Sequence, residues 1–324
     1  MSAPVAGAHP RDAGRPPAVG RGALVVAFAS IYLAWGSTYL AIRVALAGFP
    51  PPILAGTRFT VAGAGMLVAL RLAGRPVRVG ARDLGALAIV GTLLLVGGNG
   101  LVVWAEQTVS SGLAALIVAT VPLWMALLAA LPPTRERLAA RAILGLGLGL
   151  VGVGVLVAPG FRASGTLPAE VALLGATLSW SSGSVFARRH TAHIDPILAT
   201  AWEMLVGGLL FYVIALAAGS AAAFHPTAKT ALAVLYLIVA GSWIGFTAYI
   251  WLLAHVPAAK VATYAYVNPV IAVLLGWWIL DERISLTVAA GSAIIVVAVI
   301  LVTTARIVPA RLPVAEPARR VAEG

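Results

Sequence analysis

Residues 33–59, LAWGSTYLAIRVALAGFPPPILAGTRF, combine two apolar runs, a proline-rich turn and two arginines, Arg43 and Arg58. A helix that crosses a bilayer needs roughly 20 apolar residues, and each run here continues outward far enough to reach that length. Prolines end or interrupt a helix, so the PPP between the runs predicts a turn. The stretch therefore predicts two consecutive membrane-spanning helices, and it raises the question of how two arginines are accommodated beside lipid.

Composition places the whole chain in a lipid environment. Of its 324 residues, 61% are hydrophobic and only 10% are charged, whereas a typical soluble protein is roughly a quarter charged. A soluble fold of this length would need more charge to cover its surface, and apolar runs repeat here from residue 22 nearly to residue 307. The chain has no cysteine, which excludes disulfides, thiol nucleophiles and cysteine-ligated metals.

Charges, prolines and turn residues divide the chain into ten apolar spans. Every backbone polar group in lipid has to be satisfied within its own helix, so the predicted fold class is an all-α membrane protein with ten transmembrane helices. Short connections such as AEQT and HVPAA predict antiparallel neighbours. The predicted spans are residues 22–42, 53–72, 83–104, 109–131, 138–158, 168–187, 196–217, 230–253, 258–280 and 285–305.

The termini differ from the rest of the chain. Residues 1–21 and 306–324 are rich in Pro, Ala and Arg without periodicity, which predicts a disordered N-terminus and tail rather than further domains. The AFA at 27–29 is similar to a signal-peptide cleavage site, but the apolar run before it is short and continues through it. We therefore expect the span 22–42 to remain as the first helix.

The distribution of lysine and arginine predicts the orientation. With the N-terminus inside, seventeen of these residues fall on the inner side and Arg58 falls within a span, while four fall outside: Arg43, Arg162, Lys229 and Arg283. Cytoplasmic loops retain positive charge, so both termini are predicted to be cytoplasmic. Topology and attraction to anionic lipids also account for the net charge of +11, which leaves no basic patch for a nucleic acid.

The chain contains an internal repeat. The matched pairs, at shifts of 145 to 147 residues, are Trp35 with Trp180, Arg43 with Arg188, Gly63 with Gly208, Trp104 with Trp251, and Pro122 with Pro269. We assign residues 22–160 to a first five-helix repeat and 161–305 to a second. Because five is odd, the second repeat is predicted to be inverted in the membrane, and inverted repeats are the architecture on which many secondary transporters build alternating access.

Four segments carry a resemblance to a known family: WGSTYLAIRVAL, PPPILAGTRFTVAGAGML, SSGLAALIVATVPLWMALLAAL and KVATYAYVNPVIAVLLGWWILDE. With them, residues 24–305 resemble the EamA family of the drug/metabolite transporter superfamily, and look closest to bacterial inner-membrane members. The resemblance implies a ten-helix exporter of small metabolites, amino acids or drugs, with no cofactor. It also implies a central cavity lined by the first, third, fourth, sixth, eighth and ninth helices.

Arg58 lies about one and a half turns into the second span, and its repeat mate is Glu203. A charge at this depth is costly unless it reaches the interface or finds a partner. Opposite charges at related positions can pair across the halves or hold a zwitterionic or charged substrate. The alternative is that both side chains extend to the interfaces and have structural roles. Arg43, at the outer end of the first span, is expected to be an interface anchor.

Glu106 follows the third span in the hairpin predicted to face outside. A partly desolvated carboxyl titrates closer to neutral pH, so Glu106 is a candidate proton acceptor. Equally, it is a candidate cap for the next helix, whose first turn favours negative charge. If transport is coupled to protons, Glu203 and Glu106 are the plausible carriers.

Pro122 and Pro269 interrupt two helices at corresponding positions. Each proline removes one backbone hydrogen bond, and paired interruptions indicate a midplane binding site; the alternative is a packing kink. Asn268, beside the second break, is the better candidate for a substrate contact because Val121 replaces it in the first half. The side chains predicted to bind substrate are Trp35, Asn99, Trp104, Trp180, Tyr264, Tyr266 and Asn268. Tyr264 and Tyr266 cannot share one helix face, so at most one should point inward.

Other classes of function are disfavoured. GLGLVG at 147–152 matches a dinucleotide-binding pattern but lies inside an apolar helix rather than after a strand, and no P-loop is present. The five histidines lack the spacing of a metal site, so no metal is expected. A membrane-embedded enzyme or sensor would need clustered His, Asp or Ser groups, and too few acids lie in the spans. The sequence predicts a secondary transporter for a small molecule. The alternatives within transport are an uncoupled facilitator or a lipid-intermediate flippase of the same fold.

Overall fold

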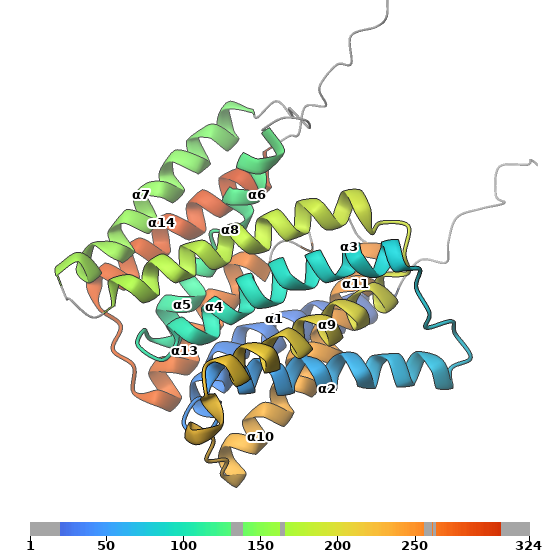
Figure 1. Ribbon diagram of the computed structural model, residues 1–324. Coiled ribbons are helices and arrows are strands. Elements are labelled where there is room, and N and C mark those ends of the chain that lie inside the picture. Colours follow the sequence, from blue (N-terminus) through green and yellow to red (C-terminus); the bar gives the residue numbers. More distant parts are fainter. Residues whose placement is uncertain (1–19, 131–138, 163–165, 256–260, 262–263, 306–324) are drawn as a thin grey trace, which may run out of the picture.

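The computed structural model describes residues 20–130, 139–162, 166–255, 261 and 264–305, and every regular element in these ranges is helical (Figure 1). The helices of the first half are α1 (Arg21–Ala45), α2 (Pro51–Leu72), α3 (Ala81–Gly91), the π-helix η1 (Thr92–Gly100), α4 (Leu101–Ala105), α5 (Ser111–Val118), α6 (Val121–Ala130) and α7 (Ala140–Arg162). Those of the second half are α8 (Leu167–His190), α9 (Pro196–Ala217), the short 3-10 helix η2 (Ser220–Ala223), α10 (Ala228–Tyr236), the π-helix η3 (Leu237–Ile244), α11 (Gly245–His255), α13 (Tyr264–Leu280) and α14 (Leu286–Thr303).

Six helical spans in the described ranges are long and apolar enough to cross a membrane: Arg21–Ala45, Pro51–Leu72, Ala81–Ala105, Ser111–Leu128, Pro196–Ala217 and Ala228–Leu252. Three shorter apolar helices lie at Ala140–Leu156, Val267–Leu280 and Leu286–Val302. These helices occupy the positions of predicted spans, and the prediction of an all-helical membrane protein agrees with them. The count of ten crossings and the inverted orientation of the halves remain predictions.

The repeat is visible in the helix bounds. α2 runs from Pro51 to Leu72 and α9 from Pro196 to Ala217, so both ends differ by 145 residues. The π-helices η1 and η3 begin at Thr92 and Leu237, again 145 residues apart. Because π-helical segments are rare and often lie at functional sites, their occurrence at one shift shows that the two halves share this local distortion.

Helices related by the repeat pack on one another, α2 on α9 and α7 on α14 (Figure 1). At the first contact, Gly63 lies against the backbone of Ala201 and Leu205, and its repeat mate Gly208 lies against the backbone of Thr60. A Cβ at either glycine would meet the backbone of the other helix. Small residues let membrane helices approach closely, which explains why both halves have glycine here.

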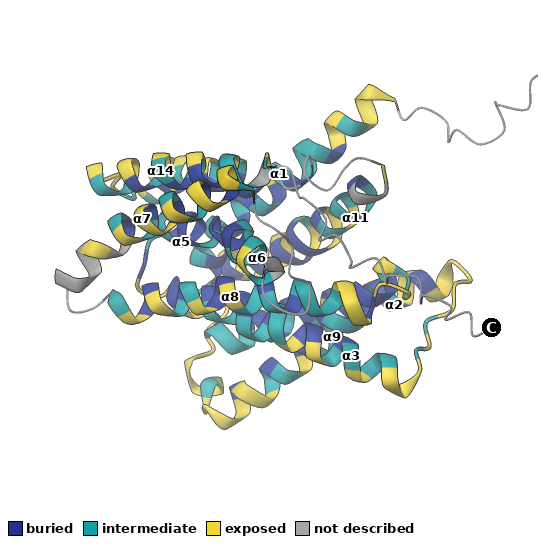
Figure 2. Cartoon of the chain, turned by 90° about the horizontal axis from the view of Figure 1, so that it is seen from above, coloured by how far each residue is buried: buried dark blue, intermediate teal, exposed yellow. Residues whose placement is uncertain are grey.

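Buried positions concentrate where helices face one another (Figure 2). Large apolar side chains remain exposed on the outside, including Leu72 (83% exposed), Leu216 (82%) and Trp278 (73%). Soluble monomers rarely expose so many large apolar groups, and lipid is the solvent that favours them. The GLGLVG pattern lies within the helix α7. Two of its three glycines pack on other helices, Gly149 on Leu123 and Gly152 on Ile295, whereas Gly147 has open space at its Cβ position.

Candidate functional site

A cavity of about 130 Å³ lies between the two halves. A cavity needs about 10–15 Å³ of such volume to hold one water molecule, so this cavity has room for a small metabolite. Helices α1, α5, α6, α8, α11 and α13, the π-helix η1 and α4 supply most of its wall, and α2 supplies Arg58. The lining residues are Trp35, Thr38, Tyr39, Ile42, Arg58, Gly98, Asn99, Val102, Ala115, Val118, Ala119, Val121, Pro122, Ala176, Thr177, Trp180, Phe246, Tyr264, Ala265, Asn268 and Pro269.

The structure brings most of the predicted site residues together at this cavity: Trp35, Arg58, Asn99, Pro122, Trp180, Tyr264, Asn268 and Pro269. The prediction that Trp104 lines the cavity is wrong, because Trp104 is 46% exposed and is not part of the lining. Trp104 follows Asn99 by five residues, which turns a helical side chain by roughly 140°, so the two face different sides. The side chain of Tyr266 lies outside the described part of the structure.

Two tryptophans, one from each half, pack on glycines of the other half, and the two contacts are related by the repeat. Trp35 of the first half packs on Gly245 at the start of α11, and its indole Nε1–H donates to the Gly241 carbonyl of η3 at 3.0 Å. Trp180 of the second half packs on Gly98 of η1. Gly98 and Gly245 are 147 residues apart, so related tryptophans meet related glycines. Each indole therefore lies at the boundary between the halves and beside the cavity.

Trp35 is also the centre of an aromatic cluster. Its ring centroid lies 5.4 Å from Phe246, 5.3 Å from Tyr249 and 5.0 Å from Tyr264, with edge-to-face or tilted geometry. Such pairs add to the stabilisation from buried area, and ring faces attract cations. The cluster gives the cavity one rigid wall suited to an apolar or cationic group. Phe246 and Tyr249 were not identified from the sequence, because only the contact with Trp35 distinguishes them from other apolar positions.

Both proline-containing segments reach the cavity, but only the first is interrupted. α5 ends at Val118 and α6 begins at Val121 with Pro122 in its first turn, whereas Pro269 lies inside α13, which continues through it. The predicted break at Pro269 is therefore a proline within a continuous helix. A proline cannot donate to the carbonyl four residues earlier, and those two residues, Val118 and Ala265, both line the cavity. Beside the second proline, Asn268 is 7% exposed and its Oδ1 has no hydrogen-bond partner within the described ranges. Asn268 thus presents an unused acceptor at the cavity.

Arg58 is 4% exposed and faces the cavity. Its Nε–H donates to the Ser242 hydroxyl at 3.2 Å, and its guanidinium carbon lies 4.7 Å from the centroid of the Phe59 ring. Neither Arg58 nor Glu203 takes part in an ion pair among the described residues, so the predicted pairing of these two side chains is not seen. Glu203 is part-buried in α9, where its backbone carbonyl lies against Gly91. A buried guanidinium without a carboxylate partner is available for an anionic group of a ligand.

Glu106 is completely buried at the end of α4, and both of its carboxyl oxygens lack a hydrogen-bond partner in the described structure. Arg43 donates a hydrogen bond to the backbone carbonyl of Glu106 rather than to its carboxylate. Burial raises the pKa of the Glu106 carboxyl well above its ordinary value, and the Arg43 guanidinium acts in the opposite direction. Arg43 is therefore more than an interface anchor, because it ties α1 to the end of α4.

The first turn of α5 has other caps. The Ser110 hydroxyl accepts from the Leu113 N–H at 3.2 Å. The Glu282 carboxylate, from the segment after α13, accepts from the Ser111 N–H and hydroxyl, both at 2.9 Å, and from the Gly112 N–H at 3.3 Å. Glu106 is thus not the cap of α5, contrary to one of its two predicted roles. Nothing in the sequence distinguished Glu282 from the other acids at the edges of apolar spans, so its role was not predicted.

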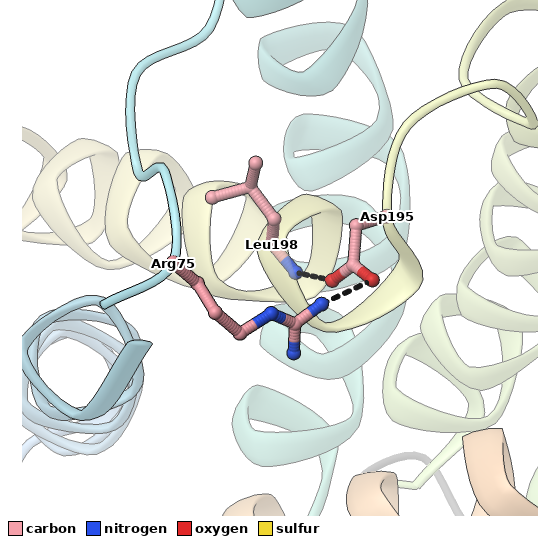
Figure 3. Close-up of polar contacts among 3 residues, drawn as sticks. All are labelled: Arg75, Asp195 and Leu198. Atoms are coloured by element: carbon pink, nitrogen blue, oxygen red, sulfur yellow. Dashed lines mark hydrogen bonds and ion pairs between the residues drawn. The ribbon is translucent and has the colours of Figure 1, made fainter. Parts of the chain in front are cut away.

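We call this region, formed by Arg43, Glu106, Ser111 and Glu282, the Glu106 end of the bundle. A second set of contacts joins the halves between the α2–α3 connection and the start of α9, which we call the Arg75 end (Figure 3). Its contacts are Arg75 with Asp195 at 2.7 Å, His193 with Asp83 at 3.1 Å, and Trp202 Nε1–H donating to the Val77 carbonyl at 2.9 Å. Polar contacts therefore link the two halves at the Glu106 end and at the Arg75 end, and none of the residues in these contacts lines the cavity.

Apolar helices around a small cavity with polar and aromatic walls define the class of an α-helical membrane transport protein. The model of the EamA-like transporter family matches the chain twice, at residues 21–158 and 167–304, and the chain belongs to this family. The predicted family resemblance is confirmed. Two separate matches of one model also agree with the internal repeat.

Named relatives point the same way. The chain is 37% identical over 289 residues to the "Uncharacterized inner membrane transporter YedA" of Escherichia coli K12, covering 89% of this chain and 93% of that protein. It is 28% identical over 293 residues to the "Probable terminal-alkyne amino-acid exporter" of Streptantibioticus cattleyicolor, covering 88% and 95%. A solved structure with 24% identity matches with a TM-score of 0.62, covering 87% of this chain and 97% of the other, which supports the fold alone. The protein is therefore a membrane transporter.

Proposed function

We propose that this transporter is a secondary exporter of small zwitterionic metabolites, of the amino-acid type, and that it works by alternating access around the central cavity. The observation that carries the proposal is Arg58, a guanidinium at the cavity that has no carboxylate partner among the described residues. Arginine binds carboxylates with strong, directional hydrogen bonds. The Asn268 oxygen and the Trp35 cluster offer an acceptor and ring faces for an ammonium group.

Further observations support the size and the class of the substrate. A cavity of about 130 Å³ suits a molecule of a few heavy atoms beyond a carboxylate and an ammonium group. One relative is named as an exporter of a terminal-alkyne amino acid. We extend that relationship to this chain as part of the proposal. The remaining predicted contacts, Asn99, Trp180 and Tyr264, line the same cavity and are proposed to orient the side chain of the substrate.

The proposed cycle uses the two halves as inverted five-helix units in a bacterial inner membrane, with both termini cytoplasmic. In this orientation the Glu106 end faces outside and the Arg75 end faces the cytoplasm. Breaking the contacts at one end while keeping those at the other would open the cavity to one side at a time, which is the requirement for alternating access. The positions of lysine and arginine support this orientation.

The test is flux into proteoliposomes across a panel of neutral and acidic amino acids, their decarboxylated amines, and quaternary cations. We expect transport of compounds with a carboxylate and loss of transport for the matching amines. Arg58→Gln should raise the KM for carboxylate substrates at least about tenfold, because one charge-assisted hydrogen bond contributes about 1.5–3 kcal/mol. The matched control is Arg71→Gln, an exposed arginine on the same helix, which should leave flux unchanged.

Two rival functions remain within the same fold. Flux of panel compounds that ignores imposed ion gradients would indicate an uncoupled facilitator. No flux for any compound, together with movement of a labelled lipid between leaflets that depends on Arg58, would indicate a lipid-intermediate flippase. Equal transport of amines and carboxylates would contradict the role proposed for Arg58.

A further inference from the structure

The most unusual polar group in the described structure is Glu106. Its side chain is 0% exposed, and neither carboxyl oxygen has a hydrogen-bond partner in the described ranges. An ionised carboxylate without a partner is very costly to bury, so such a group takes up a proton instead. Glu106 is not needed as the cap of α5, because Ser110 and Glu282 already accept from the N–H groups of its first turn. Glu106 therefore needs another explanation.

Three elements supply the charged and titratable groups that act on Glu106. α1 supplies Arg43 and Tyr39, α2 supplies Arg58, and the segment after α13 supplies Glu282. The Arg43 guanidinium donates to the Glu106 backbone carbonyl, and the Arg58 guanidinium is held by Ser242. Glu282 adds a second negative charge, which disfavours ionisation of its neighbour. The two arginines lie near Glu106 without forming an ion pair with its carboxylate, an arrangement that suits a neutral carboxyl group.

The burial of Glu106 coincides with a contact between the halves. Glu282 belongs to the second half and binds the first turn of α5 in the first half. Asp281, with φ of +53°, and the Glu282 N–H, which donates to the Gly276 carbonyl at 3.1 Å, fold this segment back onto α5. Separation of the halves at this end would remove Glu282 and admit water to Glu106.

We propose that Glu106 is the proton-binding group of the transport cycle, protonated while the Glu106 end is closed and deprotonated when that end opens. On opening, the O–H bond of the carboxyl group breaks and the proton passes to a water molecule, leaving a carboxylate that the Arg43 guanidinium can then bind. On closing, the carboxylate takes a proton back from water before it is buried. The closed form thus holds one more proton than the open form, and low pH favours closure.

This inference rests on the proposed function for its place in transport, but its conformational part can be tested without a substrate. The chain has no cysteine, so Gln107→Cys and Arg283→Cys, both at exposed positions, introduce a unique pair of spin-label sites across the Glu106 end. Distances between the labels would be measured in purified full-length protein in nanodiscs, from acid to alkaline pH. We expect short distances at low pH and a growing population of longer distances as pH rises.

Variants separate Glu106 from other acids. Glu106→Gln mimics the protonated side chain and should keep the short distance at every pH. The matched control is Glu170→Gln in α8, because Glu170 is also buried, at 2% exposed, and one of its carboxyl oxygens is unpartnered; this variant should retain the wild-type pH response. A wild-type distance that does not change with pH would overturn the proposal without recourse to any variant. A pH response that survives in Glu106→Gln and is lost in Glu170→Gln would overturn it as well.

Transport supplies the second readout, with a labelled amino acid from the panel as the probe. A pH gradient should accelerate wild-type flux, while Glu106→Gln should lose the acceleration and exchange only slowly at equal pH, because its Glu106 end rarely opens. If no panel compound is transported but the label distances respond to pH through Glu106, the proposed substrate class fails and the proton-binding role stands. If flux is normal and Glu106→Gln still responds to the gradient, the exporter stands and the role of Glu106 fails.

Discussion

The Glu282 carboxylate and the Ser111 residue of α5 are joined by two hydrogen bonds of 2.9 Å, one from the Ser111 N–H and one from its hydroxyl, across 171 residues of chain. A carboxylate at a helix N-terminus accepts from free N–H groups and interacts favourably with the helix dipole. In this protein the contact also joins the two halves, so one side chain stabilises both a helix and a closed arrangement.

Replacing Glu282 should loosen the Glu106 end. Glu282→Ala removes three acceptor contacts and should lower the free energy of unfolding by about 1–3 kcal/mol, since hydrogen bonds to charged groups each contribute on that scale and this site is partly exposed. Glu282→Gln should cost less because its amide oxygen still accepts. Thermal unfolding in detergent measures both. Arg283→Gln, at the next and exposed position, is the control, and an equal loss there would refute the specific role of Glu282.

Asp195 has two roles that substitutions can separate. Its Oδ2 pairs with Arg75 at 2.7 Å, and its Oδ1 accepts from the Leu198 N–H at 3.0 Å as the cap of α9 (Figure 3). Both partners of the ion pair are more than a third exposed, so the pair should contribute at most about 1 kcal/mol. Asp195→Asn and Arg75→Gln should therefore have small effects on the unfolding midpoint.

Loss of the cap should matter more. Asp195→Ala also removes the acceptor for Leu198 and should cost about 1 kcal/mol beyond the asparagine variant. A double-mutant cycle with Arg75→Gln isolates the ion pair. If the coupling energy exceeded the cost of removing the cap, the Arg75 end would be held mainly by charge, contrary to this prediction.

Gly245 should not tolerate a side chain. A Cβ at this position meets the Trp35 ring, so Gly245→Ala should displace the indole, lower the unfolding midpoint, and shift tryptophan fluorescence. Its repeat mate, Gly98→Ala, should act in the same way through Trp180. Gly154 has open space at its Cβ position, and Gly154→Ala should leave stability unchanged or raise it by up to about 1 kcal/mol, as alanine favours helix over glycine. Equal effects at Gly245 and Gly154 would contradict the packing argument.

Stability should fall as pH rises through the titration of Glu106. Burial raises the pKa of Glu106 in the folded protein, so the folded state binds the proton more tightly than the unfolded state does. The associated stability is therefore fully present below the unfolded pKa, which is about 4.3 for glutamate, and is lost as pH rises through the higher folded value. Unfolding midpoints recorded against pH should show this decline in wild type, and Glu106→Gln should flatten it.

Much of the architecture was accessible from hydropathy. The predicted span 196–217 coincides with α9, and the 145-residue shift found in the sequence reappears in the bounds of α2 and α9. The candidate site was predicted in part: Trp35, Asn99, Trp180, Tyr264 and Asn268 reach the cavity, whereas Trp104 does not. Trp104 was a candidate because of its aromatic residue type, and residue type alone carries no information on which face of a helix points inward.

Hydropathy and the repeat are enough to predict a repeated bundle of membrane helices, because the cost of leaving backbone groups unpaired in lipid leaves few alternatives for long apolar segments. The roles of Glu106 and Glu282, in contrast, follow from the packing of the helices. Both were acids near the ends of apolar spans, yet one caps α5 and the other is buried without a partner. That difference depends on which segments meet across 171 residues of chain, and contacts at such separation follow from the packing of the whole bundle rather than from local pattern.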